Sequence, residues 1–78
     1  MVPTLKVAEY IDAYRLRLTF SDGKVGELDL ADELWGEMFE PLKDIELFKS
    51  FRIDQELGTV VWPNGADFAP EYLYQTAA

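Results

Sequence analysis

The chain has 78 residues, of which 15 are acidic and 7 basic, and it carries a formal net charge of −8 without any cysteine or histidine. That composition excludes thiol nucleophiles, redox pairs, imidazole bases and zinc sites built on cysteine or histidine. The length fits one domain over residues 1–78, and the acidic balance argues against nucleic acid or an anionic membrane as a direct partner.

The first half of the chain predicts a three-stranded antiparallel meander. Apolar and polar side chains alternate clearly over residues 14–20 and more loosely in the flanking segments. The pattern predicts turns at residues 12–13 and 21–23 and strands over residues 5–11, 14–20 and 24–30.

The register of the second and third strands follows from the apolar pattern. A two-residue loop would place Leu16 opposite Asp29 and mix the two faces of the sheet. A three-residue loop over residues 21–23, with a glycine bulge, places Leu16 opposite Leu28 instead. We predict the latter, because a slip of one residue inverts every side chain. It also sets basic against acidic residues on the other face, with Arg17 opposite Glu27 and Arg15 opposite Asp29.

From Ala31 onward the pattern indicates short helical turns. One covers residues 31–35 and ends at Gly36, and Pro41 favours the start of another. Asp44 is a candidate cap for a helix that continues through Lys49. In that helix, we expect Ile45 and Phe48 to face the core.

The last third of the chain predicts a second hairpin and a short helix. Strands are expected over residues 51–54 and 59–62, the latter rich in β-branched residues. We expect this hairpin to extend the first sheet, and a helix to begin at Pro70 and continue through Gln75. The predicted class is α+β, with a small, mainly antiparallel sheet (a β-β-β meander, short helices, a β-β hairpin and a short C-terminal helix) and helices on one face.

Three features are candidates for function. The first is an acidic stretch in which Lys43 is the one basic residue; it fits a solvated face, a surface for a basic protein partner or, least well, a carboxylate metal site. Its acidic members are Glu27, Asp29, Asp32, Glu33, Glu37, Glu40, Asp44 and Glu46.

The second candidate is the pair Arg15 and Arg17, with Lys6 nearby on the first strand. Such a group fits a phosphate or carboxylate site. It fits ion pairs across an exposed sheet face at least as well.

The third candidate is the run from Trp62 to Asp67, in which a tryptophan adjoins a tight turn. It fits the border of a small pocket or an interaction edge. The alternative is a rigid turn in which Asp67 bonds backbone amides ahead of the last helix.

We do not expect an enzyme. The only serines, Ser21 and Ser50, have no plausible base, and neither a nucleophile elbow nor a phosphate-binding glycine loop is present. The first four residues lack a basic segment followed by an apolar run, so no signal peptide is expected. No apolar stretch reaches the length of a membrane span, and we expect a cytoplasmic location.

Several runs of the sequence resemble a small bacterial family called domain of unknown function 2442. The most specific is Thr59 to Asp67, with its Trp-Pro-Asn-Gly-Ala-Asp signature. The others are Leu16–Gly23, Asp29–Leu30, Phe39–Leu42, Phe48, Pro70–Glu71 and Leu73–Tyr74. The resemblance covers nearly the whole chain.

The resemblance implies a small α+β domain without an established catalytic residue. Some members stand alone, and others precede a helix-turn-helix domain that binds DNA. Stand-alone members are often encoded beside another small family, domain of unknown function 4160, which suggests a toxin–antitoxin-like pair.

These observations predict a non-enzymatic module that binds a small, basic protein partner, as the antitoxin-like member of such a pair. The alternative is a ligand-sensing or regulatory domain with a pocket beside the Trp62–Asp67 turn. We expect no metal or other cofactor, and a homodimer is compatible with the short edge strands. The candidate binding residues are Trp35, Glu37, Glu40, Trp62, Asn64 and Asp67.

Overall fold

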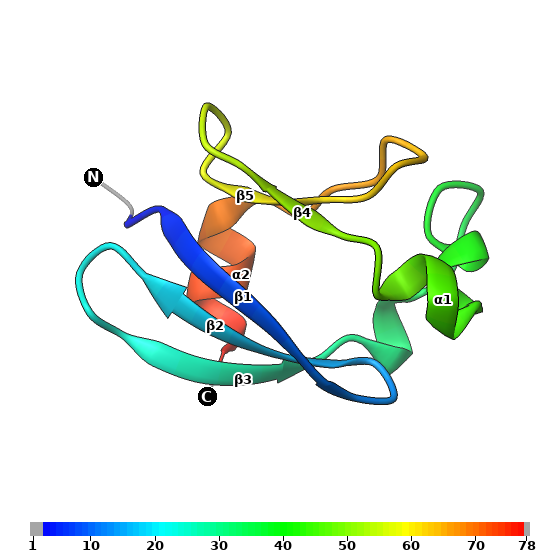
Figure 1. The fold of residues 1–78 in the computed structure, drawn as a ribbon, viewed down its shortest axis with the longest axis horizontal. Helices are drawn as coiled ribbons and strands as arrows, with labels where there is room; N and C mark the ends of the chain where they lie inside the picture. The colour runs from blue at the N-terminus through cyan, green and yellow to red at the C-terminus, as the bar shows by residue number, and fades with distance from the viewer. Residues whose placement is uncertain (1–2, 78) are drawn as a thin grey trace.

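The protein folds into two small antiparallel sheets with short helices, as a computed structural model that describes residues 3–77 shows (Figure 1). The predicted α+β class is therefore confirmed. The expectation about a signal peptide concerns Met1 and Val2 in part, and these lie outside the described residues. The elements in chain order are β1 (Leu5–Asp12), β2 (Arg15–Phe20), β3 (Val25–Asp29), the 3₁₀ turns η1 (Ala31–Glu33) and η2 (Glu40–Lys43), α1 (Ile45–Phe48), β4 (Arg52–Asp54), β5 (Thr59–Val61) and α2 (Pro70–Thr76).

The first sheet has the order β1-β2-β3 and one apolar face. Leu16 lies opposite Leu28, and Arg17 lies opposite Glu27, so the predicted register is confirmed. The β2–β3 loop has three residues, because the Phe20 N–H donates to the Lys24 carbonyl at 2.9 Å. The alternation over residues 14–20 thus fixed which face is buried: Leu16 and Leu18 are fully buried.

The turn between β1 and β2 lies one residue later than predicted. Asp12 still pairs with Arg15 in the ladder, so the loop consists of Ala13 and Tyr14. Ala13 has a φ of +42°, in the left-handed region. The sequence did not indicate this loop, because neither of its residues favours that conformation.

Replacing Ala13 with glycine is expected to raise the free energy of unfolding by about 0.5–1 kcal/mol. Glycine removes the steric cost of the positive φ, which exceeds the extra entropy that glycine loses on folding. Urea unfolding followed by circular dichroism measures the change. The control is Ala31→Gly, at an exposed alanine without a positive φ. This substitution is expected to destabilise the protein. If both variants or neither were more stable than the wild type, the backbone of Ala13 would not be strained.

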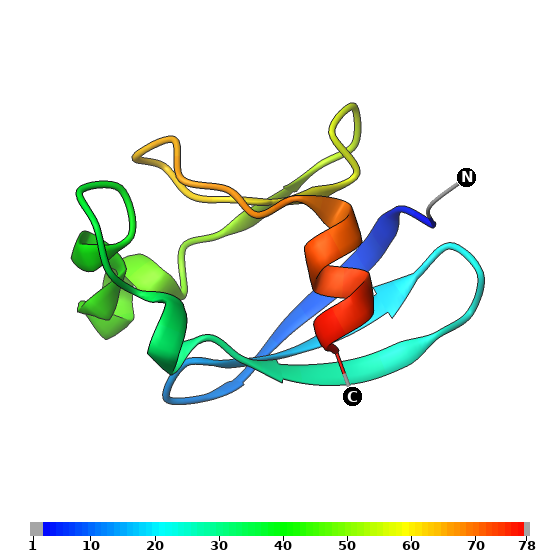
Figure 2. The ribbon, with the colours of Figure 1, turned by 180° about the vertical axis from the view of Figure 1, so that it is seen from behind.

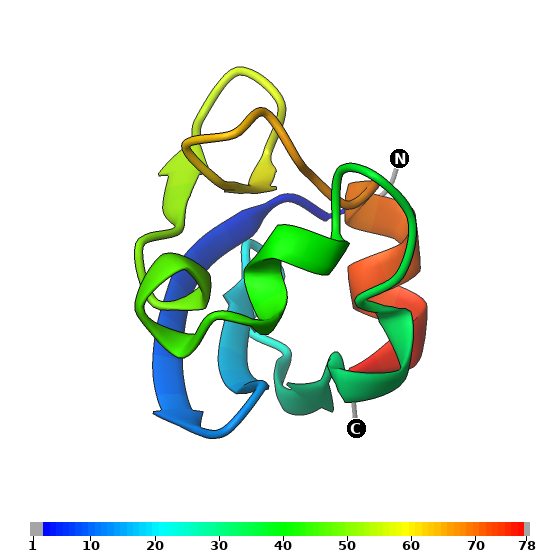
Figure 3. The ribbon, with the colours of Figure 1, turned by 90° about the vertical axis from the view of Figure 1, so that its right-hand side faces the viewer.

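The second hairpin does not extend the first sheet, contrary to the prediction. β4 and β5 form a separate two-stranded sheet that lies across the apolar side of the first, as Figure 3 shows end-on. All three residues of β5 are buried, so neither face of this strand is left for solvent. The Leu5 N–H donates to the Gly58 carbonyl at 3.0 Å and joins the two sheets at one corner.

The core lies between the two sheets and is closed by the helices. α2 runs along one side of it (Figure 2), and its Leu73 is fully buried. At one end, η2 and α1 contribute Leu42 and Phe48, which are also fully buried. The helices therefore enclose the same face of the first sheet that the hairpin covers.

The cap of α1 is as predicted, but its inward face is not. Asp44 Oδ1 accepts the backbone N–H of Glu46 at 3.1 Å, and Phe48 is buried. Ile45, however, is 37% exposed, whereas Leu47 packs against the core. The helix has only four residues, so the spacing of its apolar residues does not decide which side faces inward.

Tyr74 links α2 to the β2–β3 turn by a hydrogen bond. Its hydroxyl donates to Asp22 Oδ2 at 2.6 Å, and its ring meets Phe20 edge-on at a centroid distance of 5.0 Å. The Tyr74 hydroxyl and then the Lys24 backbone N–H lower the pKa of the Asp22 carboxyl. The donated bond raises the pKa of Tyr74 itself.

This pair predicts a dependence of stability on acidic pH. Because the Asp22 pKa is lowered by folding, its contribution is present above the unfolded-state value of about 4 and is lost as pH falls through the folded-state pKa. Tyr74→Phe should therefore destabilise at neutral pH and converge with the wild type in acid. Urea midpoints measured across the acid range test this; a constant difference between the two proteins would contradict it.

Candidate functional site: an apolar groove beside Trp35

An open groove of about 470 Å³ lies on the surface between the η1–η2 connection and the segment before α2. Its lining residues are Glu33, Trp35, Gly36, Glu37, Met38, Phe39 and Phe68. A second hollow, between β1 and the β4–β5 hairpin, measures about 90 Å³ and has room for only a few water molecules. The groove is therefore the candidate site.

Trp35 is the most exposed of the large hydrophobic residues of the groove, with 70% of its surface accessible. The neighbouring Leu34 is buried in the core, so the chain is anchored immediately before the indole turns outward. The Glu40 N–H donates to the Gly36 carbonyl at 2.9 Å and closes the following loop. A large apolar side chain is thus presented to solvent on a backbone that is held at both ends.

The floor of the groove is aromatic and continuous with the core. Phe39 packs on Phe68 at a ring-centroid distance of 4.8 Å. Phe68 also stacks on Tyr72 at 5.6 Å and meets Trp62 edge-on at 5.8 Å. These contacts fix the two phenylalanines in place, so the groove is largely formed before anything binds.

The turn in the Trp-Pro-Asn-Gly-Ala-Asp signature is bonded to the loop that carries Met38, one of the lining residues. Asn64 Nδ2 donates to the Met38 carbonyl at 2.9 Å, while Asn64 Oδ1 accepts the Ala66 N–H at 3.1 Å. The Trp62 N–H and carbonyl close the same turn, by bonds to Ala66 and Gly65. Asn64 therefore positions the loop that carries Met38 and does not itself line the groove.

Asn64→Ala is expected to lower the free energy of unfolding by about 1–2 kcal/mol, because two hydrogen bonds are lost. Asn64→Asp keeps the acceptor for Ala66 but cannot donate to Met38, so it isolates the tether to the groove. Amide exchange should speed up around Met38 but not in β2 in both variants. Unchanged exchange near Met38 in both variants would show that Asn64 does not hold the loop.

The remaining predicted site residues lie apart from the groove or beside it. Trp62 is buried, with 2% exposure, and its Nε1–H donates to the Phe48 carbonyl at 2.8 Å. Trp62 therefore does not itself line the groove, although its ring contacts Phe68, which does. Asn64, not Asp67, bonds a backbone amide in the turn; Asp67 is exposed, and its backbone pairs with Val61.

Carboxylates lie in and beside the groove. Glu33 and Glu37 are among its lining residues, and Glu40 follows at the end of the loop. Glu33 accepts a hydrogen bond from the Tyr72 hydroxyl, which raises the pKa of Tyr72. Within residues 3–77, none of these three glutamates forms an ion pair, and no group of acidic residues there is arranged to hold a metal ion.

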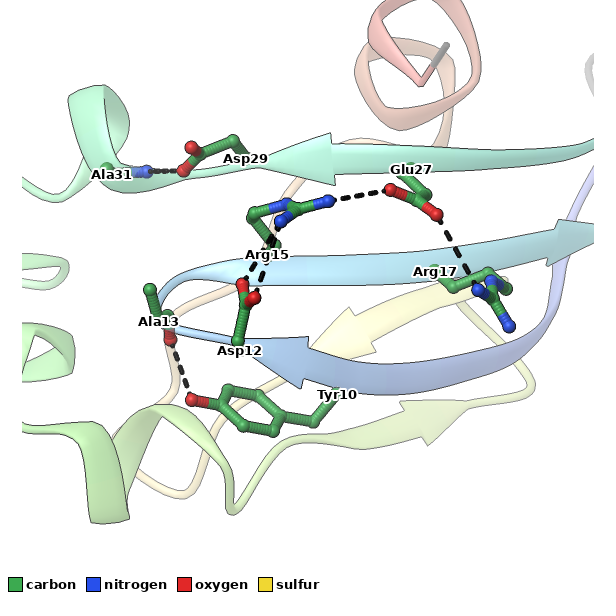
Figure 4. Close-up of polar contacts among 8 residues, drawn as sticks. All are labelled: Tyr10, Asp12, Ala13, Arg15, Arg17, Glu27, Asp29 and Ala31. Carbon is green, nitrogen blue, oxygen red and sulfur yellow. Dashed lines mark hydrogen bonds and ion pairs between the residues drawn. The ribbon is translucent and has the colours of Figure 1, made fainter.

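The arginine pair lies elsewhere, on the exposed face of the first sheet (Figure 4). Arg15 bonds Glu27 at 2.9 Å and also pairs with Asp12, and Arg17 pairs with the same Glu27 at 3.6 Å. Glu27 first, and then Asp12, raise the pKa of Arg15. Asp29 lies opposite Arg15 as predicted, but its carboxylate accepts the Ala31 N–H instead. The arginines are thus satisfied by neighbouring carboxylates.

The comparison with family models decides the chain's affiliation, because the model described as "Protein of unknown function (DUF2442)" matches residues 5–78. The chain belongs to the DUF2442 family. The resemblance seen in the sequence is therefore confirmed over almost all of its length. No curated protein and no solved structure matches the chain. None of the helices within residues 3–77 has the length and apolar character that crossing a membrane requires.

The structure brings together two of the predicted site residues, Trp35 and Glu37, and adds others that the sequence reasoning missed. The missed ones are Met38, Phe39 and Phe68. A run of large apolar residues in a connection interrupted by glycine was the available signal for the first two. Nothing in the sequence indicated Phe68, which reaches the groove only through the fold.

Proposed function

We propose that this DUF2442 protein is a non-enzymatic module that binds another protein through the groove beside Trp35. The observation that carries the proposal is a 70% exposed tryptophan that lines one groove together with the packed rings of Phe39 and Phe68. A large apolar side chain with this exposure is typical of interaction surfaces, and tryptophan is enriched among residues that dominate binding energy.

The proposal extends to the biological role. The protein is a cytoplasmic bacterial protein and the antitoxin-like member of a pair, which its family resemblance supports through the genes that accompany stand-alone relatives. The acidic surplus supports a basic partner, since charge complementarity speeds encounter and selects the partner.

Co-expression with the product of the adjacent gene tests this role. We expect a complex that survives size-exclusion chromatography, and growth inhibition by the neighbour that this protein relieves. Failure of both would overturn the proposal. Trp35→Ala, at the groove, should weaken the complex. The matched control is Leu57→Ala, which removes an exposed apolar side chain on the β4–β5 turn and should not weaken it.

A second function, the sensing of a small ligand, is favoured by the size of the groove. Its volume of about 470 Å³ falls in the range of small-molecule sites, and such sites are mostly apolar. A thermal-shift screen of metabolites discriminates between the two functions, because a ligand that binds only the folded state raises the melting temperature. No shift with any metabolite counts against this second function.

A further inference from the structure

We propose that the groove recognises a short segment of its partner that combines a large apolar side chain with flanking lysine or arginine residues. The inference rests on the proposed function, because it names the chemistry of the partner at the same surface. It follows from the lining of the groove, from the charges around it, and from the way the protein's own basic residues are engaged.

The lining of the groove favours a large apolar side chain in the bound segment. Trp35, Met38, Phe39 and Phe68 together offer aromatic faces and one flexible thioether side chain, with Met38 45% exposed. Methionine adapts to the shape of an incoming side chain, and tryptophan offers a large rigid surface. Leucine, phenylalanine or tryptophan fits this surface.

The acidic residues of the groove favour basic residues on either side of the apolar side chain in the bound segment. Glu33 and Glu37 contribute to the lining, and none of the lining residues is basic. Five of the seven basic residues in the sequence are engaged elsewhere: Arg15, Arg17 and Arg52 with carboxylates, Lys24 with Tyr74, and Lys49 over the ring of Tyr10. Among the residues that the structure describes, neither Glu33 nor Glu37 forms an ion pair, so the negative charge at the groove is left for a partner to neutralise.

The same charges disfavour a second copy of this chain as the occupant. A two-fold interface built on the groove would bring the two copies of one patch face to face. Glu33 and Glu37 of each copy would then approach those of the other, and like charges in contact oppose association. A basic segment meets no such cost.

Selection from a random 12-residue peptide library displayed on phage, with the folded full chain as the target, tests the inference. We expect the enriched peptides to carry a large apolar residue with lysine or arginine around it, and their binding to weaken as salt is raised. Enrichment of acidic or uncharged peptides, or no enrichment at all, would overturn it.

Matched variants locate the binding of an enriched peptide. Trp35→Ala should weaken it at least tenfold, and Glu37→Gln about threefold. Glu56→Gln removes the same charge at the exposed β4–β5 turn and should leave the affinity unchanged. Equal effects of the two glutamine variants, or full binding by Trp35→Ala, would reject the groove. Urea unfolding of each variant establishes that it is folded.

The two proposals fail separately. If the neighbour's product forms a complex that neither Trp35→Ala nor Glu37→Gln weakens, the antitoxin-like pairing stands, but binding through the groove is lost, and the groove inference with it. If basic apolar peptides bind at Trp35 while the neighbour's product neither binds nor is neutralised, the groove inference stands and the antitoxin-like role is lost.

Discussion

Trp62→Ala is expected to lower the free energy of unfolding by about 3–5 kcal/mol. Trp62 is 2% exposed and lies among the rings of Phe48, Phe51 and Phe68, at centroid distances of 5.8, 6.3 and 5.8 Å. Removing a buried aromatic side chain costs about 3–5 kcal/mol, whereas a chain of this length has a total stability of about 4–12 kcal/mol. The substitution therefore consumes a large share of the stability, and circular dichroism and urea unfolding measure the loss.

Trp62→Phe separates the ring from its hydrogen bond. Phenylalanine keeps part of the aromatic packing but cannot donate to the Phe48 carbonyl, so we expect a loss of about 1–3 kcal/mol. The matched control is Trp35→Ala, which removes the other tryptophan at a 70% exposed position and should change stability by no more than about 0.5 kcal/mol. Comparable losses at the two tryptophans would contradict the assignment of one to the core and the other to the surface.

The first sheet was predictable because its information is local. The alternation from Leu16 to Phe20 marks the buried face, and the loop ending at Gly23 sets the register. Only one register keeps Leu16 opposite Leu28. The shift of the preceding turn to Ala13 was not predictable, because alanine gives no signal for a positive φ.

The placement of the second hairpin was not predictable from the sequence. β4 and β5 have three residues each, and Thr59, Val60 and Val61 show no alternation that would distinguish a buried from an exposed face. Its position depends on contacts with a segment more than fifty residues earlier, such as the bond from Leu5 to Gly58.

The candidate site was predicted only in part, for the same reason. The sequence predicted Trp35 as a binding residue, which agrees with its 70% exposure, but it did not show that the other tryptophan, Trp62, is buried. The signature motif drew attention to Asn64, yet its side chain acts on Met38, 26 residues away. Side-chain contacts at that separation follow from the packing of the whole chain, which periodicity and spacing do not report.

Gly58→Ala is expected to destabilise the protein by about 2–4 kcal/mol. Gly58 has a φ of +68°, and a β-carbon there would approach Thr4 Cγ2 to 2.8 Å and Thr4 Cβ to 3.0 Å. The positive φ costs about 1 kcal/mol for alanine, and overpacking adds about 1–3 kcal/mol unless the neighbour moves. Displacing Thr4 would disturb the adjacent bond from Leu5 to the Gly58 carbonyl, where the two sheets meet.

Gly23→Ala is the control that separates steric contact from backbone strain. Gly23 has a φ of +94°, further from the left-handed minimum near +57°, but a β-carbon there would meet no atom within 4 Å. Backbone strain alone therefore predicts the larger loss at Gly23, whereas contact with Thr4 predicts the larger loss at Gly58. Urea unfolding of both variants decides between them. A larger loss at Gly58 that is partly recovered in the double variant with Thr4→Ala would establish that close packing at this corner holds the second sheet against the first.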